Sequence, residues 1–120
     1  MAGIESRAFD SPDETRAPEK TRVDVVRMGA TTAARMTFEP GWKWSECVKP
    51  VAGTDRCQAR HVGVVQSGRL HVEHDDGTEV DLGPGDAYVI EPGHDAWITG
   101  DGGFVAFEFE ARAAEEYARE

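Results

Sequence analysis

The spacing of hydrophobic residues predicts a chain made of short β-strands. Val23 and Val25 alternate with polar neighbours, and so do Ala34, Met36 and Phe38. This period of two is typical of strands with one buried face. Further strands are expected over residues 42–49, 56–67, 70–74, 79–82, 87–90 and 104–109. In the last of these, Val105, Phe107 and Phe109 share one face.

Turn-forming residues separate these strands at short intervals. Asp75-Asp76-Gly77 is a strong hairpin signal. The stretch Gly83–Trp97 predicts a turn, a strand and a second turn, because its glycines accept positive φ and its prolines fix φ. In the first turn, Asp86 is placed to accept hydrogen bonds from nearby backbone amides. Short strands at regular spacing indicate an all-β protein, either a small antiparallel barrel or a sandwich.

The two ends of the chain differ from its middle. Residues 1–20 are polar and are expected to form a flexible arm, which would either stay mobile or strap a partner subunit. Residues 21–120 then form one domain. Its last residues, 110–120, are rich in Ala, Glu and Arg and predict a short C-terminal helix.

Charge narrows the range of partners. Among 120 residues, 23 are acidic and 13 are Lys or Arg, which gives a net charge of −10. Such a chain repels nucleic acid and anionic lipid, so we expect neither as a partner. It contains no apolar run long enough to span a bilayer and no apolar leader. We therefore expect a cytoplasmic protein with reduced thiols.

Two groups of glycines resemble the paired motifs of the cupin family. Gly41 precedes Cys47 and Lys49 at the spacing of the first motif, and His61 precedes Gly68 at the spacing of that motif's end. Gly85, Pro92 and Gly93 match the second motif. The resemblance covers roughly residues 35–110. It implies a cupin-type antiparallel β-barrel, also described as a double-stranded β-helix or jelly roll.

The resemblance also implies where a metal ion would bind. The four positions that hold the ion in metal-binding cupins carry Cys47, Lys49, His61 and Ala96 in this chain. A protonated lysine repels a cation and alanine has no ligand atom. The metal site is therefore either rebuilt from other residues or absent.

Four residues are candidates for a rebuilt metal site: Cys47, Cys57, His61 and His94. Thiolate and imidazole bind zinc, and imidazole also suits iron and nickel. On a regular strand Cys57 and His61 would lie about 13 Å apart, so Cys47 with His61 is the better pair, and His94 would replace the ligand missing at Ala96. Alternatively, Cys57 is only a core residue, or the two cysteines form a disulfide, which a reducing compartment disfavours. We expect one divalent metal (zinc, iron, manganese or nickel) or no cofactor.

The same inner face suggests a site for a small molecule. Lys49, His61 and Tyr88 are its expected ligand-binding residues, because Ala59 and Gly63 leave space beside His61 and an inward lysine needs an anionic partner. A small, anionic molecule is therefore the expected ligand. Trp42 and Trp44 are expected on an outer face, where a homodimer would cover them.

Two classes of function agree with these features. The first is a cupin-barrel protein that binds a small molecule in its lumen, with or without a divalent metal. The alternative is a metal-dependent cupin enzyme, such as an oxygenase, isomerase or lyase, in which His61 is a ligand and Lys49 or Tyr88 is an acid, base or charge clamp. The fold alone does not separate them.

Overall fold

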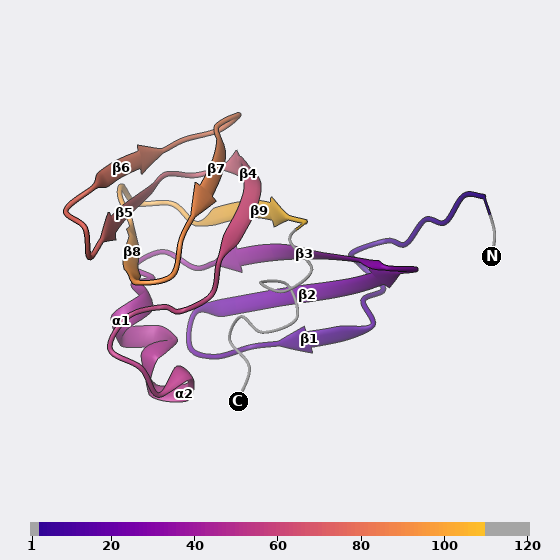
Figure 1. The fold of residues 1–120 in the computed structure, drawn as a ribbon, viewed down its shortest axis with the longest axis horizontal. Helices are drawn as coiled ribbons and strands as arrows, with labels where there is room; N and C mark the ends of the chain where they lie inside the picture. The colour runs from indigo at the N-terminus through magenta and orange to yellow at the C-terminus, as the bar shows by residue number, and fades with distance from the viewer. Residues whose placement is uncertain (1–2, 110–120) are drawn as a thin grey trace.

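The computed structural model describes residues 3–109, and its regular secondary structure is mainly β-strand (Figure 1). The described elements are two short helices and nine strands, in this order: β1 (Glu14–Arg16), β2 (Thr21–Met28), β3 (Thr31–Phe38), α1 (Trp44–Cys47), α2 (Lys49–Ala52), β4 (His61–Ser67), β5 (Leu70–His74), β6 (Glu79–Leu82), β7 (Ala87–Ile90), β8 (His94–Ile98) and β9 (Phe104–Glu108). Within residues 3–109, neither helix has the length and apolar character needed to cross a membrane.

The strands form two antiparallel sheets. The larger has the order β1-β2-β3-β9-β4-β7, and the smaller has the order β6-β5-β8. In Figure 1 the smaller sheet stands over one end of the larger, and β2 and β3 extend away from it. The predicted antiparallel β fold is confirmed. The closed barrel is not, because β6 and β7 are the edges of separate sheets in the described part of the chain.

The predicted turns form largely as expected. At the corner between β6 and β7, Gly85 has a φ of +88° and the Gly83 N–H donates to Asp86 Oδ2 at 2.8 Å. The hairpin between β5 and β6 turns at Gly77, which has a φ of +92°. The first turn connects the edge strand of the smaller sheet, β6, to the edge strand of the larger sheet, β7, and the second connects β5 to β6.

The expected strand over residues 42–49 is wrong, because the chain forms α1 and α2 there. Pro50 has no N–H to donate and therefore suits the first turn of α2. Gly53 ends α2 in the left-handed conformation, with a φ of +76°. As a result, Cys47 and Lys49 do not alternate along a strand that lines the interior.

The expected exposure of Trp42 and Trp44 is also wrong, since both side chains are buried in the core. Trp42 stacks on Phe38 with ring centroids 3.8 Å apart and donates from Nε1 to Thr21 Oγ1 at 2.8 Å. The chain's own elements therefore cover both indoles. The reason for expecting a homodimer does not hold, and a homodimer stays a prediction.

The terminal segments were expected to be an arm and a helix. Within residues 1–20, β1 pairs with β2, and the Phe9 ring lies 5.3 Å from the Phe107 ring. That part of the expected arm therefore packs against the larger sheet. The predicted C-terminal helix lies outside the described residues.

Candidate metal centre

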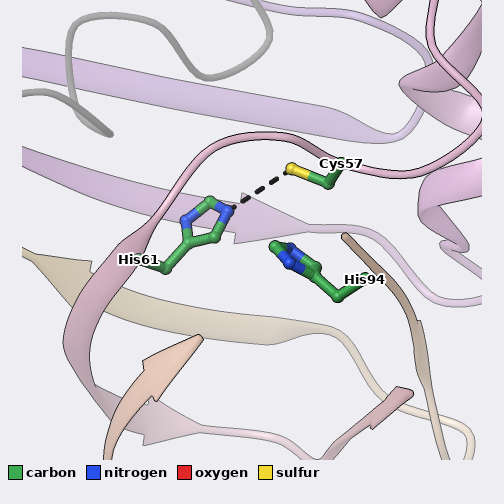
Figure 2. Close-up of side chains that lie close together, drawn as sticks. All are labelled: Cys57, His61 and His94. Carbon is green, nitrogen blue, oxygen red and sulfur yellow. Dashed lines mark hydrogen bonds between the residues drawn. The ribbon is translucent and has the colours of Figure 1, made fainter. Parts of the chain in front are cut away.

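Cys57, His61 and His94 bring their side chains together inside the protein (Figure 2). One ligand atom from each residue lies within 4.8 Å of the others, and all three side chains are buried. Cys57 Sγ and His61 Nε2 are 3.6 Å apart, and the imidazoles of His61 and His94 meet edge to face. No other group of three or more potential ligands of this kind was found among residues 3–109.

The local backbone explains how Cys57 reaches His61. The expected strand over residues 56–67 begins only at His61, so the chain between the two residues is not extended as a strand. Cys57 is instead fixed by backbone bonds to the turn before β8, with its N–H donating to His94 O at 2.8 Å and its C=O accepting from Gly93 N at 2.8 Å. The separation of about 13 Å expected for a regular strand therefore does not apply.

Hydrogen bonds orient the two imidazoles. His61 Nδ1 lies 2.7 Å from a carboxylate oxygen of Glu108, so Nδ1 donates and Nε2 faces Cys57. His94 Nδ1 lies 2.8 Å from the carbonyl oxygen of Glu91, so Nε2 is the His94 nitrogen left for the cluster. A partner that holds the outer ring nitrogen is the usual arrangement behind a metal-ligating histidine.

The cluster is polarised even without a metal ion. Burial opposes ionisation of the Cys57 thiol, but hydrogen bonds from His61 and His94 outweigh burial and lower its pKa to about 6. Burial opposes protonation of His61, but the charge of Glu108 and the hydrogen bond to Cys57 raise its pKa to about 10. Cys57 thus favours the thiolate, which is the form of cysteine that binds metals.

The distance between Cys57 and His61 suits zinc. With usual bond lengths, a tetrahedral zinc ion separates a thiolate sulfur from an imidazole nitrogen by about 3.5 Å. The observed separation of Cys57 Sγ and His61 Nε2 is 3.6 Å. One thiolate and two imidazoles are ligands that zinc accepts, whereas manganese prefers oxygen ligands. The three side chains therefore offer a set of ligands that zinc accepts, and a four-coordinate ion held by them would keep one position open.

A small cavity lies beside the cluster. It has a volume of about 30 Å³ and is lined by His61, His94, Glu108 and several aromatic side chains, including Trp44. This is enough space for a water molecule. Trp44 Nε1 is buried and has no hydrogen-bond partner among residues 3–109.

The structure does not bring Cys47 into the cluster. Cys47 lies on α1, and its Sγ is 3.6 Å from a carboxylate oxygen of Glu19. The two cysteines are not joined in a disulfide. Ala96, at the position expected to lack a ligand, lines the small cavity.

Of the other two predicted ligand-binding residues, Lys49 lies away from the cluster and Tyr88 lies beside it. Lys49 lies on α2 with its side chain 43% exposed and its Nζ 3.4 Å from Asp55, so it does not supply an inward charge. Tyr88 points inward and donates to Glu108 Oε2 at 2.7 Å. Burial and the charge of Glu108 raise the pKa of Tyr88, so its hydroxyl stays protonated.

Glu108 was missed from the sequence. The apolar face of residues 104–109 seemed to be that of Phe107, but the buried face is that of Phe104, Ala106 and Glu108. Phe107 is partly covered by Phe9 from the N-terminal segment. Glu108 alternates with Phe104 and Ala106, so a strand that buried those two residues would also bury this carboxylate, and a buried carboxylate is a candidate for a functional role.

Similarity to solved structures identifies the fold. No protein-family model and no curated protein matches this sequence. A cupin domain from Bordetella pertussis is similar, with 23% identity, a TM-score of 0.51 and coverage of 78% of this chain and 94% of that one. KdgF from Halomonas sp. has 20% identity, a TM-score of 0.59 and coverage of 85% and 91%. A protein of unknown function from Rhizobium leguminosarum has 20% identity, a TM-score of 0.62 and coverage of 90% and 97%.

These likenesses define the class of fold. The protein has a cupin-type fold, as the resemblance of its glycine motifs predicted. At this level of identity, the shared feature is the fold alone. The chemistry has to be argued from the side chains of this chain.

Proposed function

We propose that the protein binds one zinc ion through Cys57 Sγ, His61 Nε2 and His94 Nε2, and that the open position of the ion binds water or another small ligand in the inner cavity of the cupin-type fold. The observation that carries this proposal is the convergence of three buried ligand atoms within 4.8 Å. Burying a thiolate and an imidazolium together is costly, and a metal ion that displaces the imidazolium proton gives those buried groups a shared partner.

The residues around the cluster support the same assignment. Glu108 holds Nδ1 of His61 and the Glu91 carbonyl holds Nδ1 of His94, so in each ring Nε2 is the nitrogen that would bind the metal. Carboxylates and carbonyls in these places fix the ring and make the ligand more basic. Three protein ligands also leave the fourth zinc position for water or another small ligand.

A second candidate function is catalysis, because the proposed zinc ion would have one coordination position not filled by the protein. Zinc sites with three protein ligands and one exchangeable position are typical of enzymes, in which the ion lowers the pKa of bound water. The small cavity, with Trp44 and Glu108 on its walls, would hold that water. Turnover of a substrate by the zinc-loaded protein, lost on removal of zinc, would separate the enzyme from the binding module.

Metal analysis tests the proposal directly. Protein purified without a histidine tag should retain or take up one zinc per chain, and cobalt substitution should give a thiolate-to-cobalt charge-transfer band. Cys57→Ser should remove that band, and His61→Ala and His94→Ala should each abolish stoichiometric binding. Far-ultraviolet circular dichroism should confirm that each variant keeps its strands.

Two matched variants serve as controls. Cys47→Ser changes the other buried cysteine, and His71→Ala changes a histidine that pairs with Asp81 and Glu79 instead. Both should bind zinc like the parent. Equal zinc binding by the parent and His61→Ala would show that the cluster is not the site.

A further inference from the structure

A groove opens between the two edge strands β6 and β7. Its volume is about 460 Å³, within the range of pockets for small organic ligands. Most of its lining is apolar: Val72, Val80, Leu82, Ala87, Val89 and Ile90. Val80 and Val89, which both line the groove, are 47% and 57% exposed, so the groove presents apolar surface to solvent.

The polar groups of the groove are already engaged within the protein. His74 Nε2 lies 2.8 Å from Pro92 O, and its Nδ1 lies 3.0 Å from the Asp76 N and 3.2 Å from Asp76 Oδ1. The Asp76 carboxylate accepts from the Thr78 N–H, and Glu91 pairs with Arg60. The lining contains two carboxylates and no Lys or Arg.

The charges of the groove indicate which kind of small molecule would bind there. An anion would meet two carboxylates in a protein of net charge −10, with no Lys or Arg among the lining residues to balance it. Lys49 suggested an anionic ligand in the sequence, but it lies on α2 and pairs with Asp55 instead. An uncharged and largely apolar molecule suits the lining, because it would bury exposed valines without leaving any charge unpaired.

Tyr88 stands between this groove and the metal cluster. It lines both the groove and the small inner cavity. Its hydroxyl donates to Glu108 Oε2, while the other oxygen of Glu108 accepts from His61 Nδ1. A molecule in the groove would therefore contact Tyr88, which is connected to the imidazole of His61 through two hydrogen bonds, both made by Glu108.

We propose that the groove between β6 and β7 binds an uncharged, largely apolar small molecule, and that Tyr88 couples this molecule to the zinc site through Glu108 and His61. Binding in the groove does not require the metal, whereas the coupling rests on the proposed zinc site. Coupling between two sites is reciprocal, so zinc and the groove ligand change each other's affinity by the same factor.

A matched pair of fluorescent probes tests the groove. N-phenylnaphthylamine is uncharged, and anilinonaphthalene sulfonate is the same molecule with a sulfonate added. The uncharged probe should bind the full chain one to one, at least about tenfold more tightly than the sulfonated one. Equal or tighter binding of the sulfonated probe would overturn the proposed ligand class.

Surface variants locate the bound probe. Val80→Asp and Val89→Asp place a charge in the groove at exposed positions and should each weaken binding about tenfold. Phe109→Asp makes the same kind of change at an exposed residue outside the groove and should leave binding unchanged. Unchanged binding in both valine variants would contradict the groove as the site. So would light scattering that shows a dimer which these variants convert to monomers, because a second chain would then be the occupant.

Zinc dependence tests the role of Tyr88. The affinity of the uncharged probe should differ about fivefold or more between zinc-loaded and zinc-free protein. Tyr88→Phe keeps the ring but removes the hydroxyl, so the probe should still bind and the zinc dependence should disappear. An equal zinc dependence in the parent and Tyr88→Phe would overturn the coupling. Absence of zinc binding would refute the proposed function, while probe binding would still report on the groove.

Discussion

His61 donates from Nδ1 to Glu108 at 2.7 Å, and this bond joins the first residue of β4 to the last residue of β9. The two strands are neighbours in the larger sheet, so the pairing of their backbones brings the side chains together. Glu108 also accepts from Tyr88 with its other oxygen. One carboxylate thus connects the candidate zinc ligand to the wall of the groove.

We expect Glu108→Gln to weaken zinc binding by about 10- to 100-fold, because a neutral amide neither fixes the ring of His61 as well nor makes it as basic. The measurement is competition for zinc against a chelator of known affinity. The chain should stay folded, since glutamine keeps the shape of the side chain.

Glu79→Gln is the matched control for that change. Glu79 accepts from His71 at 2.8 Å, outside the metal cluster. Its substitution should leave zinc affinity unchanged. If Glu79→Gln and Glu108→Gln weakened zinc binding equally, general charge rather than the bond to His61 would be responsible.

His71 should make stability depend on pH. Hydrogen bonds to Asp81 and Glu79 raise the pKa of His71 in the folded protein. A raised pKa means that His71 stabilises the fold fully below its unfolded pKa, near 6.5, and that this contribution is lost as the pH rises through the folded pKa. His71→Gln should therefore lower the Tm more at pH 6 than at pH 9.

Thermal melts of the two proteins at several pH values provide the measurement. A constant difference in Tm across the range would mean that the charge of His71 adds nothing. The effect concerns the smaller sheet, because His71 on β5 pairs with residues of β6.

Much of the fold could be predicted from local sequence. Alternation defines β2, β3 and β5, and the glycine turns around β7 form where the sequence places them. Residues 42–49 could not be assigned in this way, because Trp42 and Trp44 alternate with polar residues as a strand would. Both indoles are buried, and Trp42 donates a hydrogen bond to Thr21, 21 positions away, which local alternation cannot reveal.

The metal cluster was only partly accessible to the same reasoning. Cys57, His61 and His94 are each suggestive residue types, but their meeting depends on backbone bonds between Cys57 and the Gly93–His94 turn. Sequence spacing on a regular strand argued against that meeting. The contact between Glu108 and His61 was even harder to predict, because the two residues are 47 positions apart and meet only through the pairing of β4 with β9.

Asp24 should contribute strongly to stability. It is a fully buried carboxylate on β2 that accepts hydrogen bonds from Arg22, Arg35 and Thr15. Asp24→Asn removes the charge and leaves Arg35 without its buried partner, so the free energy of unfolding should fall by about 2–4 kcal/mol. Urea unfolding at neutral pH measures the change.

The same carboxylate predicts acid sensitivity. Burial opposes ionisation of Asp24, but hydrogen bonds from Arg22, Arg35 and Thr15 outweigh burial and lower its pKa. Its contribution is therefore present above the unfolded pKa, near 4, and is lost as the pH falls through the folded value. The gap between the parent and Asp24→Asn should narrow below pH 4. Asp55→Asn, an exposed control, should change stability by less than about 0.5 kcal/mol.

Gly63 leaves no room for a side chain beside Glu108 at the candidate metal centre. A Cβ added there would lie 2.9 Å from Glu108 Cγ and 3.0 Å from the Tyr88 hydroxyl, and it would also clash with the backbone oxygen of Phe107. Because that oxygen belongs to the neighbouring strand β9, it has little freedom to move. Gly63→Ala should lower the free energy of unfolding by about 1–3 kcal/mol.

The zinc affinity of Gly63→Ala distinguishes a local effect from a general one. Displacing Glu108 would turn the ring of His61, so zinc binding should weaken even at temperatures where the variant remains fully folded. Gly102→Ala provides the control, because an added Cβ there meets nothing within 4 Å. It should match the parent in both stability and zinc binding. Weakened stability with unchanged zinc affinity in Gly63→Ala would show that the metal centre tolerates movement of Glu108, and that the bond between Glu108 and His61 does not set the affinity.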